Sequence, residues 1–250
     1  MRYFLKLAYD GTDFHGWQRQ PNAVSVQQTL EEAISTILQH PTEVTGAGRT
    51  DTGVHAAQMF AHFDSDKPIE KCRLLTSLNR MAGKAIAVED ILPVRDDAHA
   101  RFDAESRTYV YHISERKNPF SYRYSHFMEH LPDMDKMNEA ASLLLATEDF
   151  TAFAKLHSDA KTGICKVSEA QWTYDEKKGC LDFTITADRF LRNMVRAVVG
   201  TLVDVGRMKL SLEDFKEVIE SKDRCKAGVS MPAKGLFLNK IVYPKEIFIL

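Results

Sequence analysis

The stretch T-E-V-T-G-A-G-R-T-D-T-G-V-H-A-A-Q-M-F-A-H-F at residues 42–63 decides the predicted fold. Its first part, 42–47, and its last part, 55–63, are rich in β-forming residues, which predicts two strands. Residues 48–53 form a glycine-rich loop between them. A strand pair of this kind, with a helical pattern on either side, is the centre of a split β-α-β unit.

The segments around this pair complete the order β-α-β-β-α-β over residues 1–104. Residues 1–9 alternate in polarity and are rich in aromatic side chains, which predicts a first strand. Ser25 is a typical N-cap and predicts the start of a helix before the pair. Pro68 suits the first turn of a second helix, and residues 85–94 predict the closing strand.

The remaining residues, 105–250, repeat this order with one extra helix. The predicted elements are strands at 107–114, 167–174, 181–187 and 236–243, and helices at 134–146, at 191–205 and after Ser211. We therefore predict an α/β (α+β) fold with two similar halves, residues 1–104 and 105–250. The halves are expected to share a central mixed, largely antiparallel sheet with helices outside.

Composition excludes several classes of protein. The chain has 250 residues, of which 44% are hydrophobic and 27% charged, which is typical of a globular protein and not of a disordered or fibrous one. No apolar run reaches the ~20 residues of a membrane span, and the N-terminal residues lack the apolar region of a secretory signal. Four widely spaced cysteines fit free thiols in the cytoplasm. The net charge of −2 rules out a basic field over the whole protein, but it permits a local basic groove.

The loop between the two central strands carries the strongest chemical signal. Asp51 would stand at the tip of this loop, with Arg49 two residues away. A neighbouring arginine would keep a carboxylate ionised at neutral pH, and such a group can act as a nucleophile or base. Asp-Thr-Gly is also a good turn sequence, so a purely structural role for Asp51 is the more common interpretation of the residues alone.

Two further segments have both a structural and a functional interpretation. On the predicted helix at 191–205, Arg189, Arg192 and Arg196 would follow one face, either as a solvated stripe or as a row of cations for phosphates. Tyr109 shares a strand face with another tyrosine, which usually indicates packing within a sheet, although a tyrosine ring can also stack on an exposed base.

One motif suggests a metal site. His126, Glu129 and His130 match the pattern H-x-x-E-H of an inverted zinc-protease motif. That pattern needs a helix to bring both histidines to one face, and the flanking aromatic residues and proline favour an extended segment here. No phosphate-binding or dinucleotide motif is present, so we expect neither a cofactor nor a metal.

Taken together, these segments resemble the TruA family of transfer RNA pseudouridine synthases. The most specific match is G-R-T-D-x-G-V-H-A, present from Gly48 to Ala56. Other matching segments, in chain order, are Tyr9–Gly11, Gly16–Gln20, Ser25–Gln27, His99–Phe102, Arg107 with Tyr109–Tyr111, Asp149–Phe150 with Phe153, Met194–Arg196 with Gly200, and Gly235–Leu238. The resemblance covers nearly the whole chain.

The resemblance implies roles for individual residues. Asp51 is expected to be the catalytic aspartate that starts C1′–N1 cleavage of the target uridine, by attack on the sugar carbon or by removal of a ribose proton. Arg196 is expected to form an ion pair with Asp51, and Tyr109 to contact the uracil and assist proton transfer. Arg49 is expected to displace and replace the flipped base, and Leu236 to form an apolar wall of the base pocket.

The resemblance also implies a substrate and an assembly. The substrate is expected to be tRNA, at uridines 38, 39 and 40 of the anticodon stem-loop, and the enzyme is expected to be a cytoplasmic homodimer without a cofactor. We predict a local basic groove for the RNA, lined by Arg49, Arg101, Arg189, Arg192 and Arg196.

The chain departs from the family pattern at a few positions. Thr52 stands where the family often has alanine, and Arg192-Asn193 replaces a pair that is often histidine, so nearby RNA contacts are expected to differ in detail. Three rival hypotheses stay open on the sequence alone: a non-catalytic RNA-binding or folding module, a synthase for other RNA positions, and a zinc hydrolase at His126, Glu129 and His130.

Overall fold

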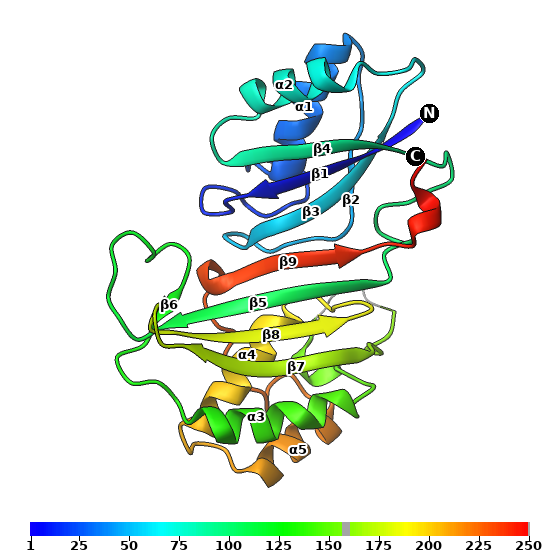
Figure 1. The fold of residues 1–250 in the computed structure, drawn as a ribbon. Coiled ribbons are helices and arrows are strands. Elements are labelled where there is room, and N and C mark those ends of the chain that lie inside the picture. The colour runs from blue at the N-terminus through cyan, green and yellow to red at the C-terminus, as the bar shows by residue number, and fades with distance from the viewer. Residues whose placement is uncertain (157–160, 250) are drawn as a thin grey trace. The chain divides into compact units, whose positions relative to one another are not determined.

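The computed structural model describes residues 1–156 and 161–249, and these residues divide into two compact units (Figure 1). Unit 1 comprises Met1–Glu105 with Leu238–Leu250, and unit 2 comprises Ser106–Phe237. The C-terminal segment therefore belongs to the same unit as the N-terminal residues.

The sheet of unit 1 contains three long strands from the N-terminal half of the chain. They are β1 (Arg2–Tyr9), β3 (His55–Asp64) and β4 (Ile86–Val94). Strand β1 lies between the other two and is antiparallel to both, so that Leu5 is opposite Ala61 on one side and Ile91 on the other. The short strand β2 (Thr45–Gly46) pairs with β3 and covers only part of the predicted 42–47.

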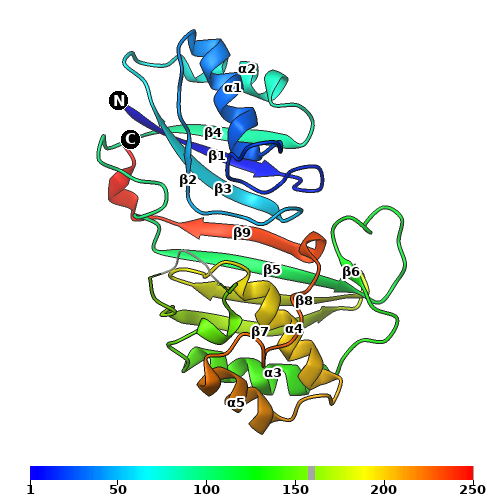
Figure 2. The ribbon, with the colours of Figure 1, turned by 180° about the vertical axis from the view of Figure 1, so that it is seen from behind.

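Two helices pack in unit 1, α1 (Val26–Leu38) and α2 (Lys71–Met81) (Figure 2). Helix α1 begins where the N-cap signal predicts, since the Ser25 side chain accepts the N–H of Gln28 at 3.2 Å. The prediction that Pro68 lies in the first turn of the second helix is wrong. The N-cap is Glu70, whose carboxylate accepts the Arg73 N–H at 2.9 Å, so the helix starts later.

The C-terminal segment completes the core of unit 1. The ring of Tyr243 packs edge-on against Phe4 and Phe60, at centroid distances of 5.3 and 5.1 Å. Its hydroxyl donates to the Ala100 carbonyl at 2.5 Å. The 3₁₀ turn η4 (Lys245–Ile247) then returns the backbone to the end of β4, where the Arg95 N–H donates to the Ile247 carbonyl. These contacts bury aromatic surface and so stabilise the unit.

In unit 2, β8 (Cys180–Ala187) lies between β5 (Ser106–Ser114) and β7 (Val167–Asp175) and is antiparallel to both. The short strand β6 (His126–Phe127) runs parallel to β5, which makes the pairing mixed. Strand β9 (Leu236–Val242) begins in this unit and continues into unit 1.

Helices α3 (Met134–Ser142), α4 (Met194–Gly206) and α5 (Leu212–Ser221) lie on one side of these strands (Figure 1). The predicted helix at 134–146 changes after Ser142 into the 3₁₀ turn η1 (Leu143–Leu145), and a second 3₁₀ turn, η2 (Thr151–Phe153), follows. Ser211 caps α5 as predicted and forms a capping box with Asp214.

The predicted class is confirmed, because strands and helices follow each other in the expected order and the helices lie on one face of the strands within each unit. The first unit shows β1-α1-β2-β3-α2-β4, and the second shows β5-α3-β7-β8-α4-α5 with β6 as an addition. Strand β9 then follows, and most of it belongs to the first unit. Among the described residues, no helix is long and apolar enough to cross a membrane. The four cysteines are free thiols, as expected.

Candidate active site

Asp51 lies in a tight turn between β2 and β3. The carbonyl of Asp51 accepts the N–H of Val54 at 3.1 Å, and Gly53 has a φ of +76°, which favours glycine. The side chain of Asp51 is half-buried, whereas Arg49 is exposed. The turn predicted from the sequence is therefore present, and the aspartate within it is not fully buried.

The loop after β1 supports this turn from behind. The N–H of Trp17 donates to the Thr50 carbonyl at 3.4 Å, and the hydroxyls of Tyr9 and Thr50 are 2.9 Å apart. The indole of Trp17 is 3% exposed and lies so close to Gly46 that a Cβ there would be 2.3 Å from the ring. This packing places an aromatic ring of the loop after β1 against a glycine of β2, where no side chain would fit.

A buried histidine fixes the other end of the turn. His55, fully buried at the start of β3, accepts the N–H of Gly11 at its Nδ1 atom, at 3.1 Å. A Cβ on Gly11 would lie 2.0 Å from the Val54 carbonyl oxygen. The backbone at Gly11, before the first helix, thus packs directly against the backbone at Val54, after Asp51. His55 has a structural role here that the sequence left undefined.

Arg101 also belongs to unit 1 and lies at its surface. Its guanidinium is 5.7 Å from the centroid of the Phe102 ring, and that ring is 73% exposed. The N–H of Arg101 donates to His99 at 3.1 Å. A cation next to an exposed aromatic ring suits contact with nucleic acid.

In unit 2, Tyr109 occupies the middle of β5, directly opposite Ile185 of β8. Its ring is half-buried and packs edge-on against Phe190 with centroids 5.0 Å apart. The Phe190 ring therefore covers one side of the tyrosine ring and restricts its rotation on the strand.

Arg196 is held by two hydrogen bonds in the first turn of α4. Its Nε donates to the Met231 carbonyl at 2.6 Å, and its own carbonyl accepts the Met231 N–H at 3.0 Å. Met231 therefore fixes both the backbone and the guanidinium of Arg196. A guanidinium held through Nε can still present its outer face to a carboxylate or phosphate.

The predicted row of three arginines on one helix is wrong. Helix α4 begins at Met194, so Arg189 and Arg192 precede it and only Arg196 is helical. The reason is Asn193, which has a φ of +66°, a left-handed conformation that no helix can include and that Asn tolerates. The Asn193 amide donates to Ser230 at 2.6 Å, which stabilises this conformation.

Leu236 begins β9 directly after the 3₁₀ turn η3 (Ala233–Gly235) and is 6% exposed. The backbone just before Leu236 packs closely against the Tyr111 side chain, because a Cβ on Gly235 would lie 2.7 Å from the Tyr111 ring. The Tyr111 hydroxyl donates to the Pro232 carbonyl at 2.8 Å. The segment 231–236 thus links Arg196, Tyr111 and Leu236 within unit 2.

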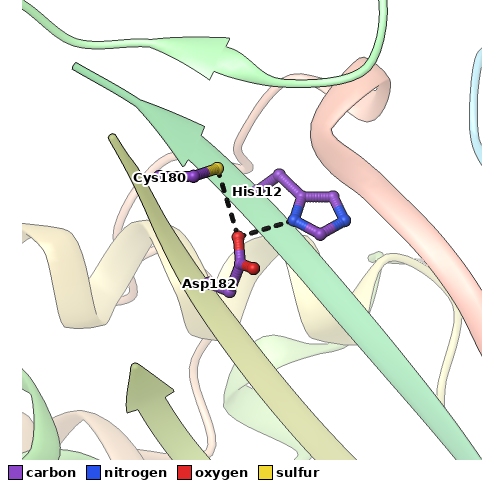
Figure 3. A group of neighbouring side chains, drawn as sticks. All are labelled: His112, Cys180 and Asp182. Atoms are coloured by element: carbon purple, nitrogen blue, oxygen red, sulfur yellow. Dashed lines mark hydrogen bonds and ion pairs between the residues drawn. The ribbon is translucent and has the colours of Figure 1, made fainter. Parts of the chain in front are cut away.

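The segment with the zinc-protease pattern is extended. His126 lies in β6 and is paired with Ile113 of the parallel strand β5. The helix that the pattern requires is therefore absent from this described segment. Burial lowers the pKa of His126, and the charges of Lys234 and Arg207 act in the same direction. The strand pairing does bring together a different cluster, His112 with Cys180 and Asp182, which the sequence did not indicate (Figure 3).

Asp51, Arg49 and Arg101 lie in unit 1, whereas Tyr109, Arg189, Arg192, Arg196 and Leu236 lie in unit 2. The structure describes the surroundings of each residue within its own unit. The pairing of Asp51 with Arg196, and the basic groove, remain predictions.

Comparison with known proteins identifies the class. The family model described as tRNA pseudouridine synthase matches residues 7–103 and 140–244. A protein named tRNA pseudouridine synthase A from Bacteroides fragilis is 53% identical over 248 residues, which cover 99% of this chain and 98% of the relative. A protein of the same name from Porphyromonas gingivalis is 53% identical over 250 residues, covering 99% of each chain.

A more distant relative shows the same full-length agreement. The tRNA pseudouridine synthase A of Acetivibrio thermocellus is 38% identical over 241 residues, which cover 96% of this chain and 98% of the relative. The chain therefore belongs to the tRNA pseudouridine synthase family, a family of isomerases.

Proposed function

We propose that this protein isomerises uridine to pseudouridine at positions 38, 39 and 40 of the tRNA anticodon stem-loop. The observation that carries the proposal is Asp51, held in a tight turn by a buried frame, in a chain that is similar over its full length to proteins named tRNA pseudouridine synthase A. In this reaction uracil is detached at N1, rotated and rejoined through C5. N1 gains a proton and C5 loses one, so no atoms are gained or lost overall.

Asp51 starts the cleavage of the C1′–N1 bond, which needs a carboxylate close to C1′. Arg196 pairs with Asp51 and orients it, and the two hydrogen bonds to Met231 support this role because they fix the guanidinium. Tyr109 contacts the uracil and assists proton transfer, which its restrained ring favours. Leu236 supplies an apolar wall next to the base.

The target base must first be displaced from the stem, at a cost of a few kcal/mol, before the enzyme can reach it. Arg49 is exposed beside Asp51 and replaces the flipped base in the stack. Arg101, Arg189 and Arg192 contact phosphates, and their contribution makes tRNA affinity fall as salt rises. The enzyme acts in the cytoplasm as a homodimer, which sedimentation of the purified protein would test.

The decisive experiment measures tritium release from tRNA labelled at uridine C5, because C5 loses its hydrogen only when it becomes the glycosidic carbon. We expect rapid release by the wild type and at most a trace, measurable only over long incubation, by Asp51→Asn, with tRNA binding retained. Asp66→Asn, at an exposed aspartate of the same unit, serves as the matched control and should release tritium normally.

Each other outcome points to a rival function. Binding of tRNA without release by the wild type would favour a non-catalytic RNA-binding module. Release from C5-labelled RNA that lacks uridines at 38, 39 and 40 would favour other target positions.

A further inference from the structure

The pairing of β5 with β8 brings three different ligand-type side chains to one face of unit 2. His112 of β5 is directly opposite Asp182 of β8, and Cys180 lies two residues before Asp182, on the same face of that strand. Nδ1 of His112 is 2.6 Å from Oδ1 of Asp182, and the Cys180 Sγ donates to the same oxygen at 3.3 Å (Figure 3). One ligand atom from each residue lies within 4.8 Å of the other two.

We propose that His112, Cys180 and Asp182 form a binding site for a zinc ion. An imidazole nitrogen, a thiolate and a carboxylate oxygen are the three ligand types that zinc takes in proteins, and three protein ligands with water in the fourth position are a common zinc arrangement. The thiol and the imidazole make the set unsuited to Mg²⁺ or Ca²⁺, which prefer oxygen ligands.

The strand framework suits such a site because it limits how far the ligands can move. Both strands are held in register over their whole length, from Arg107 opposite Ala187 to Ser114 opposite Cys180. The His112 ring also packs against Phe237, with centroids 5.1 Å apart, which restricts its rotation. A tetrahedral ion needs ligand atoms about 3.3–3.6 Å apart, as the usual zinc–ligand bond lengths imply. The His112–Asp182 contact, at 2.6 Å, must therefore open by about 1 Å, whereas the Cys180–Asp182 contact, at 3.3 Å, is already at the lower end of this range.

The charges of the ligand set match a divalent ion. In this structure the Cys180 thiol donates its proton to the Asp182 carboxylate at 3.3 Å. Zinc would take the place of this proton, which passes to solvent, and the two charges of the ion would then be balanced by one thiolate and one carboxylate.

The site is accessible and separate from Tyr109. The side chains of His112 and Asp182 are 30% and 24% exposed, so a hydrated ion can reach them. Side chains alternate between the faces of a strand, which places Tyr109 and Tyr111 on the opposite face of β5 from His112. Zinc binding therefore does not depend on the proposed isomerase activity.

Cobalt provides the direct test. The full-length protein, kept reduced with a phosphine and stripped of metal by a chelator, is titrated with Co²⁺ and then with Zn²⁺. We expect one equivalent of Co²⁺ to produce a thiolate-to-cobalt charge-transfer band and the visible bands of tetrahedral cobalt, and Zn²⁺ to remove both.

Variants separate the proposed site from other ligands. Cys180→Ser should abolish the charge-transfer band, and His112→Gln should weaken Zn²⁺ affinity by at least about tenfold, since loss of even an outer-shell partner costs 10–100-fold. Cys225→Ser, at an exposed cysteine outside the cluster, should bind as the wild type does. Circular dichroism checks that each variant is folded.

A second measurement does not depend on spectroscopy. Because an ion that binds only the native protein stabilises it, Zn²⁺ should raise the Tm of the wild type and of Cys225→Ser, and leave that of Cys180→Ser unchanged. The proposal is overturned if the wild type binds less than about half an equivalent of Zn²⁺ per chain, or if the band survives in folded Cys180→Ser. Neither result would bear on tritium release.

Discussion

The backbone of Gly16 lies directly against the carbonyl of Thr50, the residue before the proposed catalytic aspartate. A Cβ on Gly16 would be 2.3 Å from the Thr50 carbonyl oxygen, closer than real atoms approach, and Gly16 has a φ of +85°. The loop after β1 therefore sets the position of the Asp51 turn by backbone contact, which no larger residue could reproduce.

Gly16→Ala should impair both folding and catalysis. The left-handed backbone alone costs an alanine about 1–2 kcal/mol, and relief of the clash must displace Thr50 and Asp51. We expect a lower Tm and a fall in tritium release that exceeds the loss of folded protein. Urea denaturation and single-turnover kinetics on the same sample measure the two effects separately.

Gly48→Ala is the matched control, because a Cβ at Gly48 meets nothing within 4 Å and no positive φ is involved. It lies in the same motif and should leave the free energy of unfolding nearly unchanged. Equal destabilisation by both substitutions would show that the contact with Thr50 does not position the turn.

If Arg196 acts through Asp51, the effects of removing the two residues should not add. Groups that work as a unit lose most of their effect with the first substitution. We expect Arg196→Ala to lower kcat by about a hundredfold or more, and the double variant Asp51→Asn/Arg196→Ala to be no slower than Asp51→Asn. Arg80→Ala, at an exposed arginine of α2, is the control. A residual rate that falls further in the double variant would separate the two roles.

Tyr111→Phe should destabilise unit 2 by about 1–2 kcal/mol. The substitution removes the bond from the buried Tyr111 hydroxyl to Pro232 and leaves that carbonyl without its donor. At this chain length the Tm should fall by roughly 2–4 °C for each kcal/mol. Tyr174→Phe, which removes an exposed bond to Glu115, should have a much smaller effect in the same thermal scan.

The stability of unit 1 should decrease in mild acid because of His62. Burial lowers the pKa of His62 to about 4, with the charges of Arg2 and His99 acting the same way, and its Nδ1 accepts the Ala100 N–H at 3.1 Å. The unfolded chain, with an ordinary histidine pKa near 6.5, binds the proton first as the pH falls. The free energy of unfolding should therefore decrease from about pH 6.5 to about pH 4.

Urea denaturation across this pH range tests the assignment to His62. His62→Gln should start from a lower stability and show a smaller decrease over the same interval, since its side chain does not titrate. An unchanged pH slope in the variant would assign the effect to other groups.

Local signals predicted local structure well. The polar caps Ser25 and Ser211 open α1 and α5 as expected, because a cap depends on residues within one turn of the helix. The sequence pattern predicts the start of α4 too early, at residue 191, because the apolar run there suits a helix. The left-handed conformation of Asn193, which delays the start, depends on its bond to Ser230, far along the chain. Such a partner cannot be identified from helical periodicity.

The candidate sites show the same difference between local signals and partners that are far apart in the chain. The Asp51 turn is predicted by its own glycines, and its surroundings match the expectation of a tight loop between strands. His112 and Asp182 are 70 residues apart, so only the β5–β8 register brings them together. No spacing rule for metal ligands covers such a separation, and the H-x-x-E-H pattern, which does follow a rule, lies on an extended segment instead.

The return of residues 238–249 to unit 1 affects the order in which the chain can fold. The ribosome completes all of unit 2 before it makes the segment that carries Tyr243, yet Tyr243 packs on Phe4 and Phe60, which are made early. Until then the nascent N-terminal unit lacks part of its aromatic core. Until the last residues are made, this unit would therefore expose apolar surface that chaperones can bind during translation.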